Sequence, residues 1–137
     1  MSFELREHTA DVAVAARGGT LGDAFAAVAD GLATAMCEAI PAEGGERYDL
    51  AVRAEDREAL LFDYLDELIY RRDVEAVLPV DHEALVEGED EEWCLTGSFR
   101  GIPLDAVVAR DVKAVTYSDM RIAREGDKWV AYVVLDV

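Results

Sequence analysis

This sequence has few cysteines and no long apolar segment, and each of these features limits the class of protein to which it can belong. Only Cys37 and Cys94 occur, far apart, and neither belongs to a CxxC pair or stands near a histidine at zinc-site spacing. We therefore expect two buried free thiols. The sequence contains no run of roughly 18 or more apolar residues, so no membrane-spanning helix is predicted. The charged start of the chain, Met1 to Glu7, lacks the apolar segment of a signal peptide, so a cytoplasmic location is expected.

Motifs that build an active site are also lacking. The sequence contains no glycine-rich phosphate loop and no GxSxG nucleophile elbow. Neither cysteine has a histidine close to it in the sequence, and no nucleophile–base pair is evident. We therefore expect a protein that is not an enzyme.

Positive charge is the third scarcity, since the formal net charge is −17 and Lys113 and Lys128 are the only lysines. A field of this sign repels phosphates, so direct binding of nucleic acid is not expected. Two explanations stay open. The acidic surface could meet a basic partner, or the composition could be halophilic, with carboxylates keeping the surface hydrated in a high-salt cytoplasm. The acidic residues are spread along the chain, with one denser run at Glu87–Glu92, and this spread favours the second explanation.

Two helices are predicted in the first half of the chain. Thr20 is a typical N-cap with Asp23 three residues later, and apolar residues then recur at three- and four-residue steps until a break before Pro41. A second apolar stripe begins after Glu55-Asp56. We expect Arg71-Arg72 to end this helix, where the helix dipole favours positive charge.

The remaining segments predict strands. Residues 3–7, 12–17, 48–52, 77–86, 93–100, 112–124 and 128–137 are strand candidates, and Gly126-Asp127 predicts a hairpin between the last two. The chain of 137 residues has no internal repeat or linker, so residues 1–137 are expected to form a single domain. Because the helices come early and the strands mostly late, we predict an α+β fold, with two helices packed on a mainly antiparallel sheet in a two-layer or sandwich-like arrangement.

Three segments could carry function. The first is His8-Thr9-Ala10-Asp11, which places an aspartate beside a histidine at a strand start. Such a pair suits a hard-metal site or acid–base chemistry. Aspartate is equally common as a turn residue, and a lone histidine is commonly structural. From the residues alone, the structural interpretation is favoured.

The second segment is the end of the sequence. Asp136 lies on the opposite face of the predicted strand from Leu135, and the α-carboxylate of Val137 follows it. Two neighbouring anionic groups could bind a divalent cation through oxygen ligands. A solvated strand end is the plainer interpretation.

The third segment is Val112–Tyr117. Alternation on a strand would place Lys113, Val115 and Tyr117 on one face. Lys113 could pair with a carboxylate of a metal cluster or contact a phosphate of a partner. It could also be an ordinary lysine on the strand surface.

Taken together and in this order, these segments resemble the archease family. The resemblance runs nearly end to end, and its most specific parts are HTADV at residues 8–12, KAVTY at residues 113–117 and the final Asp136-Val137. It also includes Phe3–Leu5, the Ala24-Phe25 and Met36 positions, and the helix with Leu60-Leu61 and Tyr64–Leu68.

The resemblance implies a function that composition does not. By its similarity to archeases, the chain is expected to be a non-catalytic activator of an RtcB-type RNA ligase. Such ligases join RNA ends in tRNA splicing with guanosine triphosphate and manganese. The activator is expected to promote guanylylation of the ligase and repeated turnover. The family's functional aspartates correspond to Asp11 and Asp136 and its lysine to Lys113, with Val137 completing a metal site. Calcium is expected in a crystal, and manganese or magnesium in use.

One departure from the family pattern follows the KAVTY string. Where the family usually has a histidine after the tyrosine, this sequence has Ser118, while His8 remains available to orient a ligand. Two alternatives stay open. The chain could be a general chaperone or adaptor for RNA-modifying enzymes, in which charge acts diffusely. It could also be a small metal-dependent hydrolase that uses His8 and Asp11.

Overall fold

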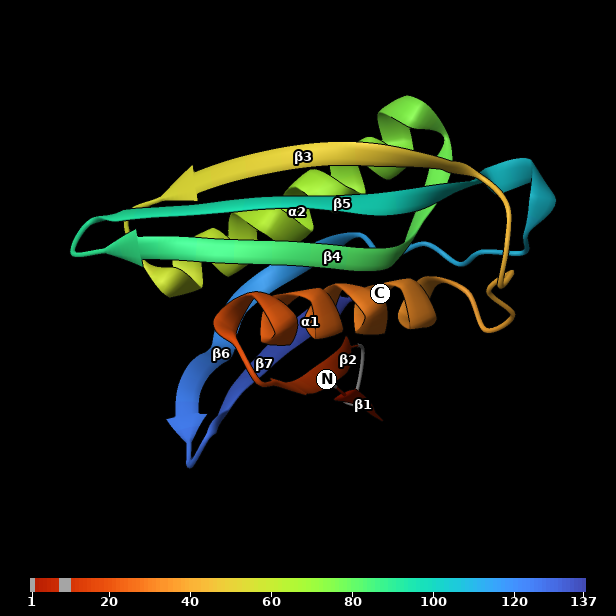
Figure 1. Cartoon of the computed structure of the whole chain (residues 1–137). Coiled ribbons are helices and arrows are strands. Elements are labelled where there is room, and N and C mark those ends of the chain that lie inside the picture. Colours follow the sequence, from red (N-terminus) through yellow and green to blue (C-terminus); the bar gives the residue numbers. More distant parts are fainter. Residues whose placement is uncertain (1, 8–10) are drawn as a thin grey trace.

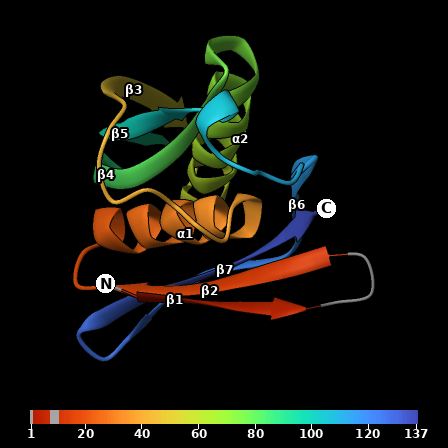
Figure 2. The same ribbon diagram turned by 90° about the vertical axis from the view of Figure 1, so that its right-hand side faces the viewer.

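A computed structural model of the protein, which describes residues 2–7 and 11–137, contains two antiparallel sheets with two helices between them (Figure 1). The helices are α1, Leu21–Met36, and α2, Arg57–Glu75. Each helix packs against strands of both sheets, so the helices form the middle layer (Figure 2). The α+β prediction is confirmed, and the sandwich has a helical layer between its sheets.

Helix α1 begins at its predicted cap, Thr20, and α2 begins directly after Glu55-Asp56, where the sequence predicts its start. The backbone N–H of Asp23 donates to the Thr20 hydroxyl at 3.0 Å, and that of Ala59 donates to the Asp56 carboxylate at 2.7 Å. Each cap satisfies an N–H that the first helical turn leaves without a partner. The predicted end of α2 at Arg71-Arg72 is wrong, because the helix continues to Glu75. Arg72 lies in the last turn of α2, but its side chain is buried and bonded to another segment.

The first sheet, sheet A, contains both ends of the chain in the strand order β1-β2-β7-β6. Its β6–β7 hairpin is confirmed, with Glu125 opposite Lys128. The predicted placement of Leu135 and Asp136 on opposite faces of β7 agrees with their burial: Leu135 is fully buried and Asp136 is partly exposed, although Val134, on the same face as Asp136, is also buried. The strands are β1 Ser2–Glu7, β2 Asp11–Gly18, β6 Ala114–Glu125 and β7 Lys128–Asp136.

The second sheet, sheet B, has the order β3-β5-β4 and is followed by the short 3-10 helix Leu104–Ala106. The register of β4 shifts between Val80 and Glu83, where Asp81 adopts the left-handed conformation with φ 52°. The strands are β3 Glu46–Ala54, β4 Val77–Glu89 and β5 Glu92–Pro103.

A continuous cluster of buried apolar side chains joins the three layers. It includes Phe25 from α1, Leu65 from α2, Phe99 from sheet B and Leu135 from sheet A. Because one core serves both sheets, the inner face of each sheet is anchored to the helices and only its outer face meets solvent.

The structure also tests two predictions, that both cysteines are buried free thiols and that no helix spans a membrane. Both cysteines are free thiols; Cys37 is buried as predicted, whereas Cys94 is partly exposed. Neither helix in the described part of the chain combines the length and apolarity needed to cross a bilayer.

Candidate metal and partner site

Asp11 and Asp136 face each other at one end of sheet A. Asp11 is the first residue of β2, Asp136 is the last of β7, and the antiparallel register sets them directly opposite. Side chains at such positions point to the same face, with Cβ atoms about 4.5–5.5 Å apart. The fold therefore brings the two aspartates together, as the resemblance implies. Their service as metal ligands remains a prediction.

The pair is electrostatically unfavourable in the absence of a cation. Carboxylates directly opposite on neighbouring strands repel each other, and both side chains are only half-exposed, so water screens them incompletely. Within residues 2–7 and 11–137, no group of three or more His, Cys, Asp or Glu side chains forms a metal cluster. The oxygen donors that the register brings together are therefore the two aspartates, and Val137, which follows Asp136, packs its side chain against the core. This all-oxygen set suits a hard divalent cation.

Lys113 lies on the other side of Asp136. Ala114, the first residue of β6, is opposite Asp136, and the backbone N–H of Lys113 donates to the Asp136 carbonyl at 2.8 Å. The side chain of Lys113 is exposed. Asp11, Asp136 and Lys113 thus lie on three neighbouring segments at the same end of one sheet.

The face predicted for Lys113, Val115 and Tyr117 requires a correction. Since β6 begins at Ala114, its alternation does not extend to Lys113. Val115 is buried in the core, and Tyr117 stacks on Phe62 of α2 with ring centroids 4.3 Å apart. Val115 and Tyr117 therefore face the helical layer, whereas the backbone of Lys113 belongs to the preceding segment.

The segment after Thr116 is irregular. Between the pairs Thr116–Val134 and Arg121–Tyr132, β6 advances five residues while β7 advances two. Ser118 is exposed within this stretch.

The hydroxyl of Tyr117 stays protonated at neutral pH. Desolvation, followed by the nearby Asp63 and Asp56 carboxylates, raises the pKa of Tyr117.

His8 lies outside the described residues, as do Thr9 and Ala10. Its expected orienting role therefore stays a prediction.

Two arginines that the sequence did not single out as site residues hold the segment before β6. Arg72 of α2 donates to the Val112 carbonyl at 3.1 Å, and Arg110 donates through Nε to the Ala35 carbonyl at the end of α1 at 2.7 Å. The pair Arg71-Arg72 was visible in the sequence, but only as a charge at a helix end. Which arginine turns inward depends on the packing of α2 against the segment.

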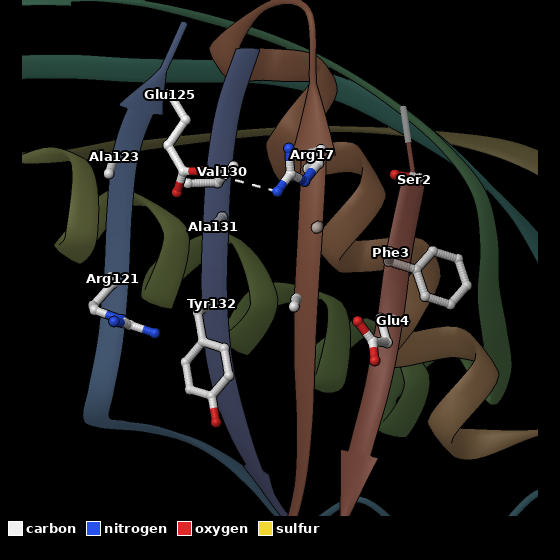
Figure 3. A pocket seen from close by; sticks show the side chains of 12 residues that line it. Ser2, Phe3, Glu4, Arg17, Arg121, Ala123, Glu125, Val130, Ala131 and Tyr132 are labelled. Atoms are coloured by element: carbon white, nitrogen blue, oxygen red, sulfur yellow. Dashed lines mark ion pairs between the residues drawn. The ribbon is translucent and has the colours of Figure 1, made fainter.

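The outer face of sheet A also carries a shallow hollow of about 410 Å³ (Figure 3). Arg17 and Glu125 form an ion pair at 3.9 Å across it, and the Arg121 guanidinium lies 5.2 Å from the centre of the Tyr132 ring. By strand alternation this is the face that bears Asp11 and Asp136, but the hollow lies toward the other end of β2 and β7. Because its charges are mixed, the hollow does not select a ligand of one sign.

The sequence model of the Archease protein family matches residues 3–137. The chain belongs to the archease family. It is 36% identical over 139 residues to protein archease from Pyrococcus furiosus, with 98% of each chain covered. It is 37% identical over 139 residues to protein archease from Thermococcus gammatolerans, again with 98% of each chain covered.

Solved structures agree with this archease fold. A solution structure of a Methanobacterium thermoautotrophicum protein matches with a TM-score of 0.85 and 31% identity, covering 98% of each chain. A crystal structure from Thermotoga maritima, described as an archease and possible chaperone, matches with a TM-score of 0.64. It is 21% identical, with 96% of this chain and 94% of that chain covered, and at that identity it supports the fold alone.

The sequence also offered no sign that His82 of this archease is buried and bonded to a carboxylate. The Nδ1 atom of His82 lies 2.7 Å from a carboxylate oxygen of Asp30, which also accepts the backbone N–H of His82 at 3.1 Å. The link joins α1 to β4 in sheet B, whereas the aspartate pair lies in sheet A. Among the described residues, His82 Nε2, the Tyr64 hydroxyl and the Thr116 hydroxyl are buried without a hydrogen-bond partner. Burial, followed by the Asp30 carboxylate, raises the pKa of Tyr64, so this hydroxyl is neutral.

Proposed function

We propose that this archease is a non-catalytic activator of an RtcB-type RNA ligase. In this proposal it promotes guanylylation of the ligase and its repeated turnover in tRNA splicing and RNA repair, in the cytoplasm. The partner is the ligase, and direct contact with nucleic acid contributes little because the chain carries a net charge of −17.

The observation that carries the proposal is the direct opposition of Asp11 and Asp136 at the end of sheet A. A fold that has to be stable by itself does not gain from facing carboxylates. Such an arrangement is typical of a site in which function overrides a local rule of stability. The exposed Lys113, whose backbone N–H binds the Asp136 carbonyl, brings a positively charged side chain to the same end of the sheet.

Asp11, Asp136 and the Val137 carboxylate would hold a divalent cation, calcium in a crystal and manganese or magnesium in use. When bound, such an ion supplies positive charge that stabilises phosphate oxygens and orients a nucleotide. The carboxylates of this chain would bind the ion and present it at a protein surface. Lys113 would limit the repulsion between the carboxylates or contact a phosphate held by the partner.

The test is guanylylation of the cognate ligase with substoichiometric amounts of this protein. We expect the wild-type chain to stimulate the reaction and to support several turnovers per activator molecule. Asp11→Ala and Asp136→Ala should fold and yet fail to stimulate, because each removes half of the aspartate pair.

A matched control is Asp127→Ala, which removes an equal charge from the hairpin at the other end of β7. This variant should stimulate like the wild type. Full stimulation by both site variants would contradict the proposal. Equal, partial losses in all three variants would favour a general adaptor whose acidic surface acts diffusely.

A further inference from the structure

We propose that Arg72 is a positioning residue for Lys113. From the last turns of α2 it holds the segment that carries Lys113 against the end of sheet A. The inference rests on the proposed function, in which the Lys113 ammonium group acts beside the aspartate pair. In this inference α2, a helix of the middle layer, contributes to the site by positioning Lys113.

Arg72 makes one contact that fixes the backbone and two that do not. Its side chain is only 10% exposed, and Nη1 donates to the Val112 carbonyl at 3.1 Å in a buried hydrogen bond. Nη2 contacts Asp111 at 3.1 Å and Nε contacts Asp73 at 3.0 Å, but these carboxylates are 69% and 62% exposed. Ion pairs that are open to solvent hold weakly. A buried carbonyl that loses its donor loses far more, so the Val112 bond is the main constraint.

The backbone on both sides of Lys113 is therefore held. Val112, with a side chain that is fully buried, is bound through its carbonyl by Arg72, and the N–H of Lys113 is bound by the Asp136 carbonyl. Earlier in the segment, Arg110 fastens the chain to the end of α1 through its own N–H and its Nε.

This arrangement limits where the Lys113 ammonium group can reach. A lysine side chain has four rotatable carbon bonds, and on a loose loop its charge would sample a wide volume. Anchoring the backbone one residue away restricts that volume to the neighbourhood of Asp136. Fixing a functional group in this way reduces the entropy that is lost when it contacts a partner.

The neighbouring Arg71 provides a matched control. It lies on the same helix and is also partly buried, with a side chain that is 23% exposed. Its Nε pairs with Glu67 at 2.9 Å and its Nη2 donates to the Asp49 carbonyl of β3 at 3.1 Å. Arg71 thus fastens α2 to sheet B, whereas Arg72 fastens it to the Lys113 segment.

The first measurement is amide hydrogen exchange by NMR in Arg72→Met and Arg71→Met. Methionine keeps an unbranched apolar stem that can fill the same space, so the substitution removes the hydrogen bond to Val112 while keeping much of the packing. We expect the Lys113 amide to exchange about tenfold faster in Arg72→Met, the equivalent of one lost hydrogen bond. In Arg71→Met it should be unchanged. Wild-type exchange at Lys113 in Arg72→Met would overturn the inference without any assay of the ligase.

The second measurement is a double-mutant cycle on ligase stimulation with Arg72→Met, Lys113→Ala and the combination. If Arg72 acts through Lys113, both single variants lose stimulation and the combination loses no more than Lys113→Ala. Additive losses, or full stimulation by Arg72→Met beside an inactive Lys113→Ala, would overturn the inference and leave the proposed function intact. No stimulation by the wild-type chain would overturn the proposed function itself.

Discussion

The outer face of sheet B and the end of sheet A that bears Asp11 and Asp136 differ in how their charges are paired. On the outer face of sheet B, Arg47 lies between Asp81 at 3.1 Å and Glu83 at 3.4 Å, and Arg100 approaches the same Asp81 at 3.8 Å. At the end of sheet A, Asp11 faces Asp136, a residue of the same charge. Both sheets belong to one chain with a net charge of −17, so composition does not explain the difference.

In the proposed function, the contrast separates charges that support the fold from charges that bind a ligand. Arg47 also donates to the Ser98 hydroxyl at 3.0 Å, so its network satisfies itself and needs no added ion. The aspartate pair lowers stability through like-charge repulsion, which a cation would relieve in the proposed function. An acidic protein has many carboxylates on its surface. Those that the sheet register holds directly opposite each other are the candidates for a functional site.

The largest expected effect is on metal affinity. We expect Asp11→Asn to weaken calcium binding by at least about 100-fold, because even the loss of a group that only supports a ligand weakens metal binding 10- to 100-fold. Asp81→Asn, which removes a carboxylate from the network of sheet B, should bind calcium like the wild type. Isothermal titration calorimetry at constant ionic strength distinguishes the two, and equal losses would abolish the contrast between the sheets.

Calcium should also stabilise the wild-type fold. A ligand that binds only the folded state at 100 times its dissociation constant adds about 2.7 kcal/mol to the free energy of unfolding. We expect this gain in thermal or urea unfolding of the wild type, with magnesium at equal ionic strength compared alongside. The Asp136→Asn variant should show no gain. A gain retained in that variant would place the cation elsewhere on the acidic surface.

Breaking the network of sheet B should have a smaller effect. Arg47→Ala removes contacts to Asp81, Glu83 and Ser98, but the Arg47 side chain is 36% exposed. Exposed ion pairs contribute roughly 0.2–1 kcal/mol, so we expect a loss of about 1 kcal/mol in urea unfolding. Stimulation of the ligase and calcium affinity should not change. If either changes, the two sheets are coupled and the contrast between them is incomplete.

The smallest effect has the opposite sign. In the presence of a chelator, Asp11→Asn should stabilise the fold by roughly 0.2–1 kcal/mol, because it removes a like-charge pair on neighbouring strands. The gain should shrink as salt is raised, since screening weakens the repulsion in the wild type. Urea unfolding at low and high salt measures both quantities. Destabilisation at low salt would show that the aspartates are held by attractive contacts.

Local chemistry in the sequence predicted the elements well. Thr20 and Asp56 cap the two helices because their side-chain oxygens reach an N–H three residues on, a rule that needs no tertiary contact. The β6–β7 hairpin follows in the same way from the turn at Gly126, where φ is 65°. The predictions failed where a distant segment decides the outcome. The role of Arg72 was misjudged, because its side chain bonds to Val112, forty residues later in the chain.

The sequence by itself determined the α+β class, the Thr20 cap, the start of α2, the β6–β7 hairpin and the identity of the candidate site residues, because each depends on neighbours in the chain or on the family pattern. Only the tertiary structure decided that Asp11 and Asp136 lie directly opposite, that Lys113 precedes β6 and binds Asp136 through its backbone, and that Arg72 holds its segment. These facts depend on sheet register and on which buried carbonyl needs a donor. Both are settled when segments far apart in the sequence pack together.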